Sequence, residues 1–522
     1  MKKTAVVYDK WLPTMGGGEM VACTMARILK NLGYDVIFAS GRLVPPYQIK
    51  KNLNIDMSDI AFEEVWNDPI KLKRLCGNKD LFINVTFMDY NYGYAKKNIY
   101  YTLFPTEPYL NIKGWILNNF IFPIFSKLVK PMEFINKPEL TLMKSGHYMH
   151  VLDECIRIAF SYLKPNNTYL IKFSIFLENF FKGALESYDW QLEEASIIKK
   201  EVFVNHETNV IHYYGYFKPV TSTVYLELKK KTKCPETVYF LYPKIINIRI
   251  PEFMYRLLYE KARSRLRAGI FNNILNRLSS YQTILADSEF TQLNIKRYWK
   301  KKTKILYPPV ELMFKKNYSD SSAKKNWITS VGRFFTLGHG KRQEILINAF
   351  KKLYDSGLID WELHLVGGVG NEPSSLAFVE KLKKDAQNYP VFFHFNASRK
   401  QVVQILLDSK IYWHAAGYGE DEIKNPIKFE HFGIAPIEAI SAGCYPILYK
   451  GGGLKEIITK LELDENIHLF SNIEHLVELS KKAVSFTYKN TFEFLNERLK
   501  KNLLKFFSTD TFLKQFTEIV SH

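Results

Sequence analysis

The stretch that most constrains the fold is residues 428–456, which read KFEHFGIAPIEAISAGCYPILYKGGGLKE. Two of its carboxylates, Glu430 and Glu438, are separated by seven residues, and a Phe-Gly pair follows the first of them. The apolar segment 434–442 predicts a helix that ends at Gly443, and YPILY then predicts a short buried strand before three consecutive glycines. Turn, helix, strand and glycine loop in one short run indicate a step of a doubly wound sheet.

In sheets of this kind, ligands bind at the carboxyl ends of the strands, where these loops lie. A carboxylate at the start of a helix and glycines after a strand suit a polar ligand that carries hydroxyls and phosphates. On these residues alone the plainer interpretation is favoured, in which Glu430 caps the helix and Glu438 is solvated.

Composition narrows the class of protein and its partners. The chain has 522 residues, enough for two or three domains, and 72 Lys and Arg against 53 Asp and Glu give a net charge of +19. This excess leaves anionic lipid surfaces, phosphate-bearing substrates and nucleic acid open as partners. The five cysteines never form a CxxC pair, which argues against a disulfide framework or a zinc site. The sequence predicts neither a signal peptide nor a membrane span.

The first half predicts a Rossmann-like domain. A strand over 4–9 is followed by the loop GGGE, which contains Gly17 and Gly18, and by a helix to about residue 31. Glycines at a helix N-terminus let backbone amides approach an anion, although a plain turn explains them as well. Over about 137–251 the alternation of strands and helices stops and strand-like pieces appear, so we expect an insertion.

Two segments of the first half raise the question of a membrane surface. The aromatic segment 109–135 predicts either an interfacial membrane segment or a helix packed on the domain core. The strongly basic segment 253–278 predicts a helix whose lysines and arginines are solvated or contact acidic lipid or nucleic acid. The histidines of the insertion lack metal-ligand spacing, so we expect no metal site there.

The polar stretch 315–326 predicts the domain boundary, after which the α/β alternation restarts. A strand over 327–331 is followed by Arg333 and then by Lys341. Two cations at the carboxyl end of a strand are well placed to neutralise a diphosphate, the alternative being two solvated bases.

Taken together, these segments resemble glycosyltransferase family 4, a group of enzymes with the GT-B fold. The likeness runs through SVGRFF, GHGKRQ, HLVGG, WHAAGYGEDE, KFEHFGIAPIEAISAG and GGGLKEII, and in the first half through GGGE, the strand with Pro105 and ADSEFTQLNIKRYW. It implies an α/β chain with two Rossmann-like domains that face each other across a cleft. We expect the first domain over 1–312, the second over 313–505, and a final helix over 506–522 that packs back on the first.

The resemblance also implies a reaction, the transfer of a hexose from a UDP- or GDP-sugar with retention of configuration and without a metal or other cofactor. Arg333 and Lys341 would hold the donor diphosphate, and Glu430 would contact the donor sugar near the reacting centre. The remaining substrate-binding positions implied by the family are Gly17, Gly18, Phe432, Gly433, Ile434 and Glu438, of which Glu438 would bind the ribose.

The chain departs from the family on the acceptor side. Many relatives carry a histidine just before the Phe-Pro turn, whereas Leu103 stands there in this chain, so no acid or base is assigned to the first domain. We expect a lipid-linked or cell-surface glycan acceptor and a cytoplasmic enzyme at the inner face of a membrane. The alternatives are a non-catalytic binding protein on the same scaffold and, less favoured because no known motif accompanies the charge, a nucleic-acid-binding protein.

Overall fold

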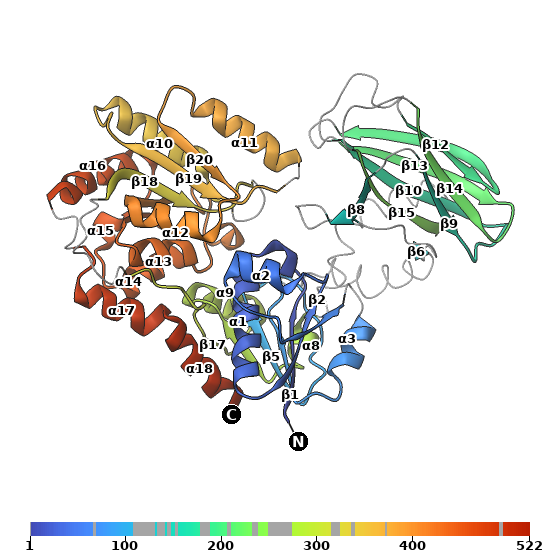
Figure 1. Ribbon diagram of the computed structural model, residues 1–522, viewed down its shortest axis with the longest axis horizontal. Helices are drawn as coiled ribbons and strands as arrows, with labels where there is room; N and C mark the ends of the chain where they lie inside the picture. Colours follow the sequence, from blue (N-terminus) through green and yellow to red (C-terminus); the bar gives the residue numbers. More distant parts are fainter. Residues whose placement is uncertain are drawn as a thin grey trace. The chain divides into compact units, whose positions relative to one another are not determined.

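The computed structural model divides the chain into two compact units (Figure 1). The first comprises Met1–Glu107, Leu275–Gly370 and Phe378–His522, and the second comprises Pro108–Ile274 with Asn371–Ala377. The predicted insertion, about 137–251, lies inside the second unit. The residues that the structure describes are 2–65, 69–107, 131–132, 141–142, 148–151, 155–177, 188–205, 210–231, 238–248, 274–314, 324–335, 340–370, 373–489 and 494–521.

Seven parallel strands form the N-terminal sheet of the first unit, in the order β17-β16-β5-β4-β1-β2-β3. Apolar runs such as TAVVYD are buried almost throughout, as expected for parallel strands covered by helices on both faces. The strands are β1 (Thr4–Asp9), β2 (Asp35–Ser40), β3 (Ala61–Glu64), β4 (Leu81–Asn84), β5 (Lys97–Thr102), β16 (Thr283–Ala286) and β17 (Lys304–Ile305).

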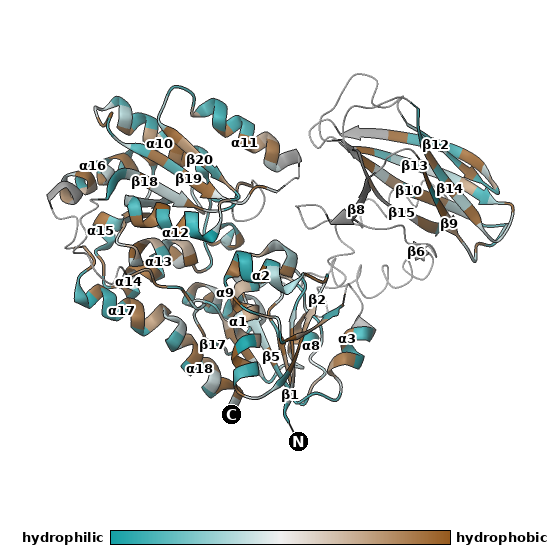
Figure 2. Ribbon diagram, in the orientation of Figure 1, coloured by the Kyte–Doolittle hydropathy of each residue, from teal (hydrophilic) through white to brown (hydrophobic). Residues whose placement is uncertain are grey.

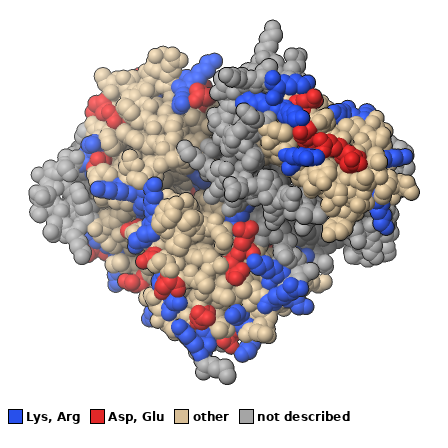
Figure 3. All heavy atoms as spheres, turned by 45° about the vertical axis from the view of Figure 1, so that its right-hand side comes forward, with Lys and Arg blue, Asp and Glu red and all other residues tan. Residues whose placement is uncertain are grey.

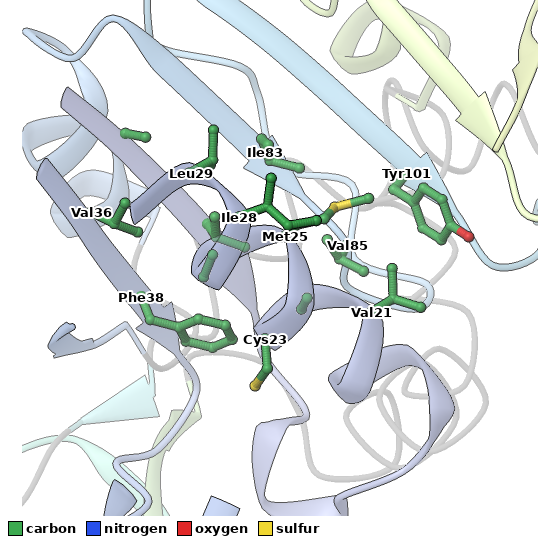
Figure 4. Packing of buried hydrophobic residues seen from close by; sticks show 14 of the residues in the cluster. Val21, Cys23, Met25, Ile28, Leu29, Val36, Phe38, Ile83, Val85 and Tyr101 are labelled. Carbon is green, nitrogen blue, oxygen red and sulfur yellow. The ribbon is translucent and has the colours of Figure 1, made fainter. Parts of the chain in front are cut away.

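Helices from both ends of the chain cover this sheet. Val21, Met25 and Leu29 of α1 point into the sheet's core, as the periodicity of that segment predicts (Figure 4). Phe512 and Phe516 of α18 belong to the same core, so the end of the chain completes the N-terminal half. The helices are α1 (Gly17–Asn31), α2 (Pro46–Leu53), α3 (Pro69–Cys76), α8 (Ile274–Leu278), α9 (Glu289–Trp299) and α18 (Thr509–Ser521).

A second parallel sheet lies in the C-terminal half of the same unit, in the order β20-β19-β18-β21-β22-β23. Its strands are β18 (Lys325–Val331), β19 (Glu362–Gly367), β20 (Val391–Phe395), β21 (Ser409–His414), β22 (Tyr445–Tyr449) and β23 (Leu469–Phe470). The accompanying helices are α10 (Gln343–Asp355), α11 (Pro373–Asp385), α12 (Arg399–Asp408), α13 (Ile434–Ser441), α14 (Gly453–Lys460), α15 (Glu465–His468), α16 (Ile473–Lys489) and α17 (Glu497–Phe507).

The second unit consists of antiparallel strands, which confirms the strand character predicted for the insertion. Its sheets have the orders β12-β13-β10-β15-β8-β7, with β6 beside β15, and β11-β14-β9, and both sheets contribute to one buried core. In that core the Trp190 ring meets Phe173 edge-on at 5.4 Å. The strands are β6 (Pro131–Met132), β7 (Thr141–Leu142), β8 (Tyr148–Val151), β9 (Cys155–Phe160), β10 (Thr168–Leu177), β11 (Tyr188–Glu193), β12 (Ala195–Asn205), β13 (Val210–Pro219), β14 (Val224–Lys230) and β15 (Val238–Ile248).

Hydropathy and charge follow this architecture. Apolar residues concentrate on the central strands, and helices such as α1 and α17 alternate polar and apolar positions (Figure 2). Lys and Arg are interspersed with Asp and Glu on the face drawn in Figure 3. Among the described residues, no helix has the length and apolar character needed to cross a bilayer. Of the two segments considered for membrane contact, 109–135 and 253–278, only 131–132 and 274–278 are described.

Candidate active site

The turn that carries Glu430 is shaped by glycines on both sides. Gly433, directly before α13, has a φ of 110°, and a Cβ there would lie 2.9 Å from Ile457 Cδ1. Both facts exclude an ordinary side chain, because L residues rarely adopt this conformation and the space is filled. The Phe-Gly pair in the sequence therefore marks a tight turn into the helix.

The triple glycine after β22 packs against this turn. A Cβ on Gly452 would lie 2.5 Å from the carbonyl oxygen of Glu430, and the Gly453 amide donates to that oxygen at 2.8 Å. A Cβ on Gly451 would lie 2.4 Å from Phe429 Cε1. The sequence indicates a phosphate ligand for these glycines, but their close packing shows a different use, which is to support the backbone that presents Glu430.

The carboxylate of Glu430 is held by two donors. Lys341 Nζ and His414 Nε2 each lie 2.6 Å from the same oxygen, Oε2. Lys341 reaches Glu430 from the segment before α10. Its side chain passes so close to the end of β18 that a Cβ on Gly332 would lie 2.5 Å from Lys341 Cγ. The interpretation of Glu430 as a helix cap is therefore wrong, since its carboxylate is bound to these side chains.

Burial alone would raise the pKa of Glu430, but the charge of Lys341 and the hydrogen bond from His414 hold that pKa well below its usual range. For His414, burial lowers the pKa of the imidazole although Glu430 opposes this. At neutral pH the arrangement is thus an ionised carboxylate beside a neutral imidazole. Because Nε2 donates to Glu430, Nδ1 is left as an acceptor, 3.3 Å from a Tyr412 hydroxyl that also has the Val331 carbonyl oxygen as an acceptor at 3.4 Å.

Glu438 is also buried and paired, so its interpretation as a solvated residue is wrong. It lies on α13 with 5% of its surface exposed, and Arg399 donates to its two oxygens at 2.6 and 3.0 Å. Arg399 is the first residue of α12, and it also donates to Glu311 at 3.2 Å. Burial raises the pKa of Glu438, and the contact with Arg399 opposes this increase.

Arg333 and Lys341 leave the end of β18 together, as predicted, but their surroundings differ. Arg333 is exposed, and Gln343 Nε2 donates to its carbonyl oxygen at 3.1 Å. Its charge acts on Glu19 of α1, where burial raises the carboxyl pKa and Arg333 lowers it. Among the described residues, Arg333 forms no salt bridge, and its guanidinium lies 5.4 Å from the centre of the Phe335 ring. Residues 336–339, between the two cations, lie outside the described residues.

The N-termini of α1 and α13 meet in the first unit. A Cβ on Gly17 would lie 2.8 Å from Ile434 Cδ1, the first residue of α13. A Cβ on Gly18 would lie 2.6 Å from Leu103 Cδ1. The positive dipole ends of two helices thus lie close together, and at the start of α1 the Glu19 carboxylate already accepts the Gly16 amide at 2.6 Å.

The two halves of the first unit are joined beside the site. The His431 ring stacks on Phe104 of the N-terminal half at 4.1 Å between centroids, and its Nε2 donates to the carbonyl of Ile427 at 3.1 Å. Burial lowers the pKa of His431 to about 4, so it is neutral at physiological pH. On α14, the Glu456 carboxylate accepts the amide of Glu289 at 2.9 Å and caps the N-terminus of α9.

Sequence reasoning missed His414, Arg399 and His431 as parts of this arrangement. His414 ends a buried strand in the run IYWH, and a polar side chain at the carboxyl end of a parallel strand is the signal that pointed to Arg333. Arg399 gave no such signal, because its sequence position indicates only the first turn of a helix. His431 lies between two residues that we did assign, Glu430 and Phe432. The Phe432 side chain packs in the core beside Tyr307 at 5.7 Å, which leaves only its backbone for a ligand.

Comparison with known proteins assigns the second half to a family model. Residues 314–501 match the model described as Glycosyl transferases group 1. A curated relative, GDP-Man:Man(3)GlcNAc(2)-PP-Dol alpha-1,2-mannosyltransferase from Dictyostelium discoideum, is 26% identical over 242 residues. That alignment covers 41% of this chain and 46% of the relative, so the chain spans about half the length of the curated protein it matches.

Solved structures support the fold of the described residues. A glycosyltransferase from Rickettsia africae is 13% identical with a TM-score of 0.51, and the match covers 99% of this chain and 97% of that one. Anabaena HepE in complex with UDP-glucose is 12% identical with a TM-score of 0.51, and both chains are covered completely. The predicted GT-B fold is confirmed, and the C-terminal half contains a glycosyl transferases group 1 domain.

Proposed function

We propose that this chain is a retaining glycosyltransferase that uses a UDP- or GDP-sugar. The observation that carries the proposal is the buried, ionised Glu430, held by Lys341 and His414 in a group 1 domain beside the start of α13. An anionic carboxylate near the sugar stabilises positive charge that develops at the anomeric carbon as the nucleotide leaves. Preorganised charge of this kind is often the largest contribution to a rate enhancement.

The negative charge on the leaving diphosphate needs its own partners. Arg333 is exposed, has no salt bridge among the described residues and follows the strand from which Lys341 departs, so both cations can meet a phosphate. The N-termini of α1 and α13 add backbone amides to the same region, through Gly17, Gly433 and Ile434. We assign the donor diphosphate to these groups and the ribose hydroxyls to Glu438.

We propose a lipid-linked or cell-surface glycan as the acceptor, used at the inner face of a membrane. The lipid-linked glycan named in the Dictyostelium relative and the net charge of +19 support this acceptor class. Sedimentation with anionic vesicles tests the membrane part, since charge-driven binding falls as salt rises. We expect the chain to pellet with the vesicles at low salt, and its absence from the pellet would remove the membrane part.

Metal independence is part of the proposal, because Arg333 and Lys341 supply the positive charge that a divalent cation would otherwise bring to the diphosphate. We expect unchanged activity when EDTA replaces added Mg²⁺ or Mn²⁺. Loss of activity that returns with either metal would contradict this assignment.

A thermal-shift screen against UDP, GDP and their sugars tests the donor class, because a ligand that binds only the folded state raises the Tm. Release of the nucleoside diphosphate, measured with the stabilising donor and a lipid extract as acceptor, then tests the chemistry. We expect Lys341→Ala to lose most of this release and to remain folded. A chain that binds a donor but never turns it over would favour the non-catalytic binding protein.

A further inference from the structure

The contacts of Glu430 are unevenly divided between its two oxygens. Both Lys341 Nζ and His414 Nε2 lie on Oε2, and no described residue donates to Oε1. The side chain keeps 14% of its surface exposed, so the carboxylate is not sealed into the protein. One oxygen is therefore anchored, and the other is open to a ligand hydroxyl or to the reacting sugar.

The two anchors differ in how firmly they are fixed. Lys341 ends a long side chain with 13% of its surface exposed, and an ammonium group exchanges readily between a carboxylate and a phosphate. His414 is 1% exposed at the end of β21, a strand that is buried along its whole length. Behind the ring, the Tyr412 hydroxyl lies 3.3 Å from Nδ1 and donates to the carbonyl oxygen of Val331 at 3.4 Å, so its single proton serves one of these two acceptors at a time.

A donor diphosphate thus creates a conflict if Lys341 serves both groups. When the ammonium turns to the phosphate, Glu430 loses one of its two donors while it remains largely buried. A buried carboxylate without a partner is costly and takes up a proton instead of staying charged. Because His414 is enclosed at the end of a buried strand, with 1% of its side chain exposed, it is the donor that stays.

We propose that His414 is the positioning residue that keeps Glu430 ionised and oriented while Lys341 turns to the donor diphosphate, with Oε1 presented to the donor sugar. This proposal rests on the proposed function, and it adds a role for a residue that does not itself touch the substrate. It assigns the two donors to Glu430 separate tasks: Lys341 responds to the ligand, and His414 fixes the carboxylate.

Three variants test the role of His414. His414→Leu removes the donor at similar volume, and His414→Gln restores an N–H near the position of Nε2. His468→Leu is the matched control, because His468 is 2% exposed in the same half of the chain and its Nδ1 donates to the carbonyl oxygen of Pro446 at 2.8 Å.

The readout is kcat and the donor KM for nucleoside diphosphate release. Because a hydrogen bond to a charged group carries about 10- to 100-fold in an equilibrium or rate, we expect His414→Leu to lower kcat by about that factor. The donor KM should change by less than about threefold, since His414 does not bind the donor. His414→Gln should recover most of kcat, and His468→Leu should lower the Tm without changing kcat. Equal kcat in the leucine and glutamine variants, or no loss in either, would overturn the proposal.

A second measurement tests the coupling between His414 and Glu430 without relying on turnover. The Tm losses of His414→Leu, of Glu430→Gln and of the double variant form a cycle in which paired residues give non-additive losses. We expect the double variant to lose clearly less than the sum of the single losses, and additive losses would overturn the proposal. If the wild type released no nucleoside diphosphate from any donor, the proposed function would fail while this cycle still tested the pairing.

Discussion

Glu430 and Glu438 have seven residues between them in one stretch, yet the fold gives them different partners. Both carboxylates are largely buried and both meet a cation at 2.6 Å. Glu430, on a turn, shares one oxygen between Lys341 and His414, whereas Glu438, on a helix, receives a two-pronged contact from Arg399. A lysine is a point charge on a flexible stem, and an arginine fork fixes both carboxylate oxygens at once.

This difference teaches which of the two carboxylates is available for chemistry. Glu430 keeps an oxygen without a donor from the described residues, and its cation can leave for another anion. Glu438 has both oxygens occupied, so its proposed contact with the ribose requires that it use the remaining lone pairs or that Arg399 shift. We therefore expect substitutions at Glu430 to act on catalysis and substitutions around Glu438 to act on stability and donor affinity.

The largest expected effect is that of Glu430→Gln. Glutamine keeps the shape but removes the charge beside the anomeric carbon, so kcat should fall by about 10³-fold, the size seen when one preorganised electrostatic contact is lost. The measurement is nucleoside diphosphate release under saturating donor. A kcat within tenfold of the wild type would show that the charge of Glu430 is not used in the reaction.

Arg399→Ala should affect stability rather than kcat. It leaves the buried carboxylate of Glu438 without its partner, which costs about 3–5 kcal/mol when one member of a buried pair is removed. Chemical denaturation measures this free energy, and Arg399→Lys should recover only part of it because the fork is lost. If Arg399→Ala unfolded at the same denaturant concentration as the wild type, the stabilising role of the Arg399–Glu438 pair would be contradicted.

A smaller effect is expected for Glu438→Gln. If Glu438 binds the ribose in the ground state and the transition state alike, its loss raises the donor KM and leaves kcat nearly unchanged. A hydrogen bond to a charged group suggests a KM increase of about tenfold or more. Steady-state kinetics in the donor concentration measures both constants, and a fall in kcat at constant KM would place Glu438 with Glu430 in the chemical step.

The smallest effect is on the pH dependence of stability, where the two carboxylates should differ in sign. The pKa of Glu430 lies below its unfolded value of about 4.3, so the stability from its charge is complete above that pH and is lost as the pH falls through the folded pKa. The stability deficit of Glu430→Gln should therefore shrink in acid.

For Glu438 the folded pKa is raised, so the wild type gains stability relative to Glu438→Gln as the pH falls toward the unfolded value. Its deficit should then grow or stay constant in the same range. Denaturation of the wild type and both variants between pH 3 and 7 would check the two signs, and parallel curves would contradict the comparison.

How far the sequence predicted this site follows from how local each feature is. The strand and helix around Glu430 and Glu438 were predictable because an apolar run, a Phe-Gly turn and a glycine at the helix end are consecutive signals. The pairing of these two glutamates with Lys341, His414 and Arg399 could not be predicted, because the three partners come from other elements and meet the glutamates only when the sheet is assembled. The likeness to a known family supplied the functional roles, but not the contacts that hold the side chains.

The glycines illustrate the same limit. A run of three glycines signals close approach of the backbone, and the sequence cannot tell whether a phosphate or a neighbouring chain segment approaches. In the structure it is the Glu430 turn that lies against Gly452 and Gly453. The second unit is a further case, because alternation predicted its strands while nothing in the sequence indicated which strands pair.

The central claim is that Lys341 leaves Glu430 to bind the donor diphosphate, while His414 keeps its hydrogen bond to Glu430. A crystal structure of the chain with bound UDP or GDP, chosen by the thermal-shift screen, tests this directly. The claim predicts Lys341 Nζ within hydrogen-bond distance of a phosphate oxygen and His414 Nε2 still on Oε2 of Glu430. A diphosphate bound away from Lys341, or a Glu430 carboxylate released by His414, would contradict it.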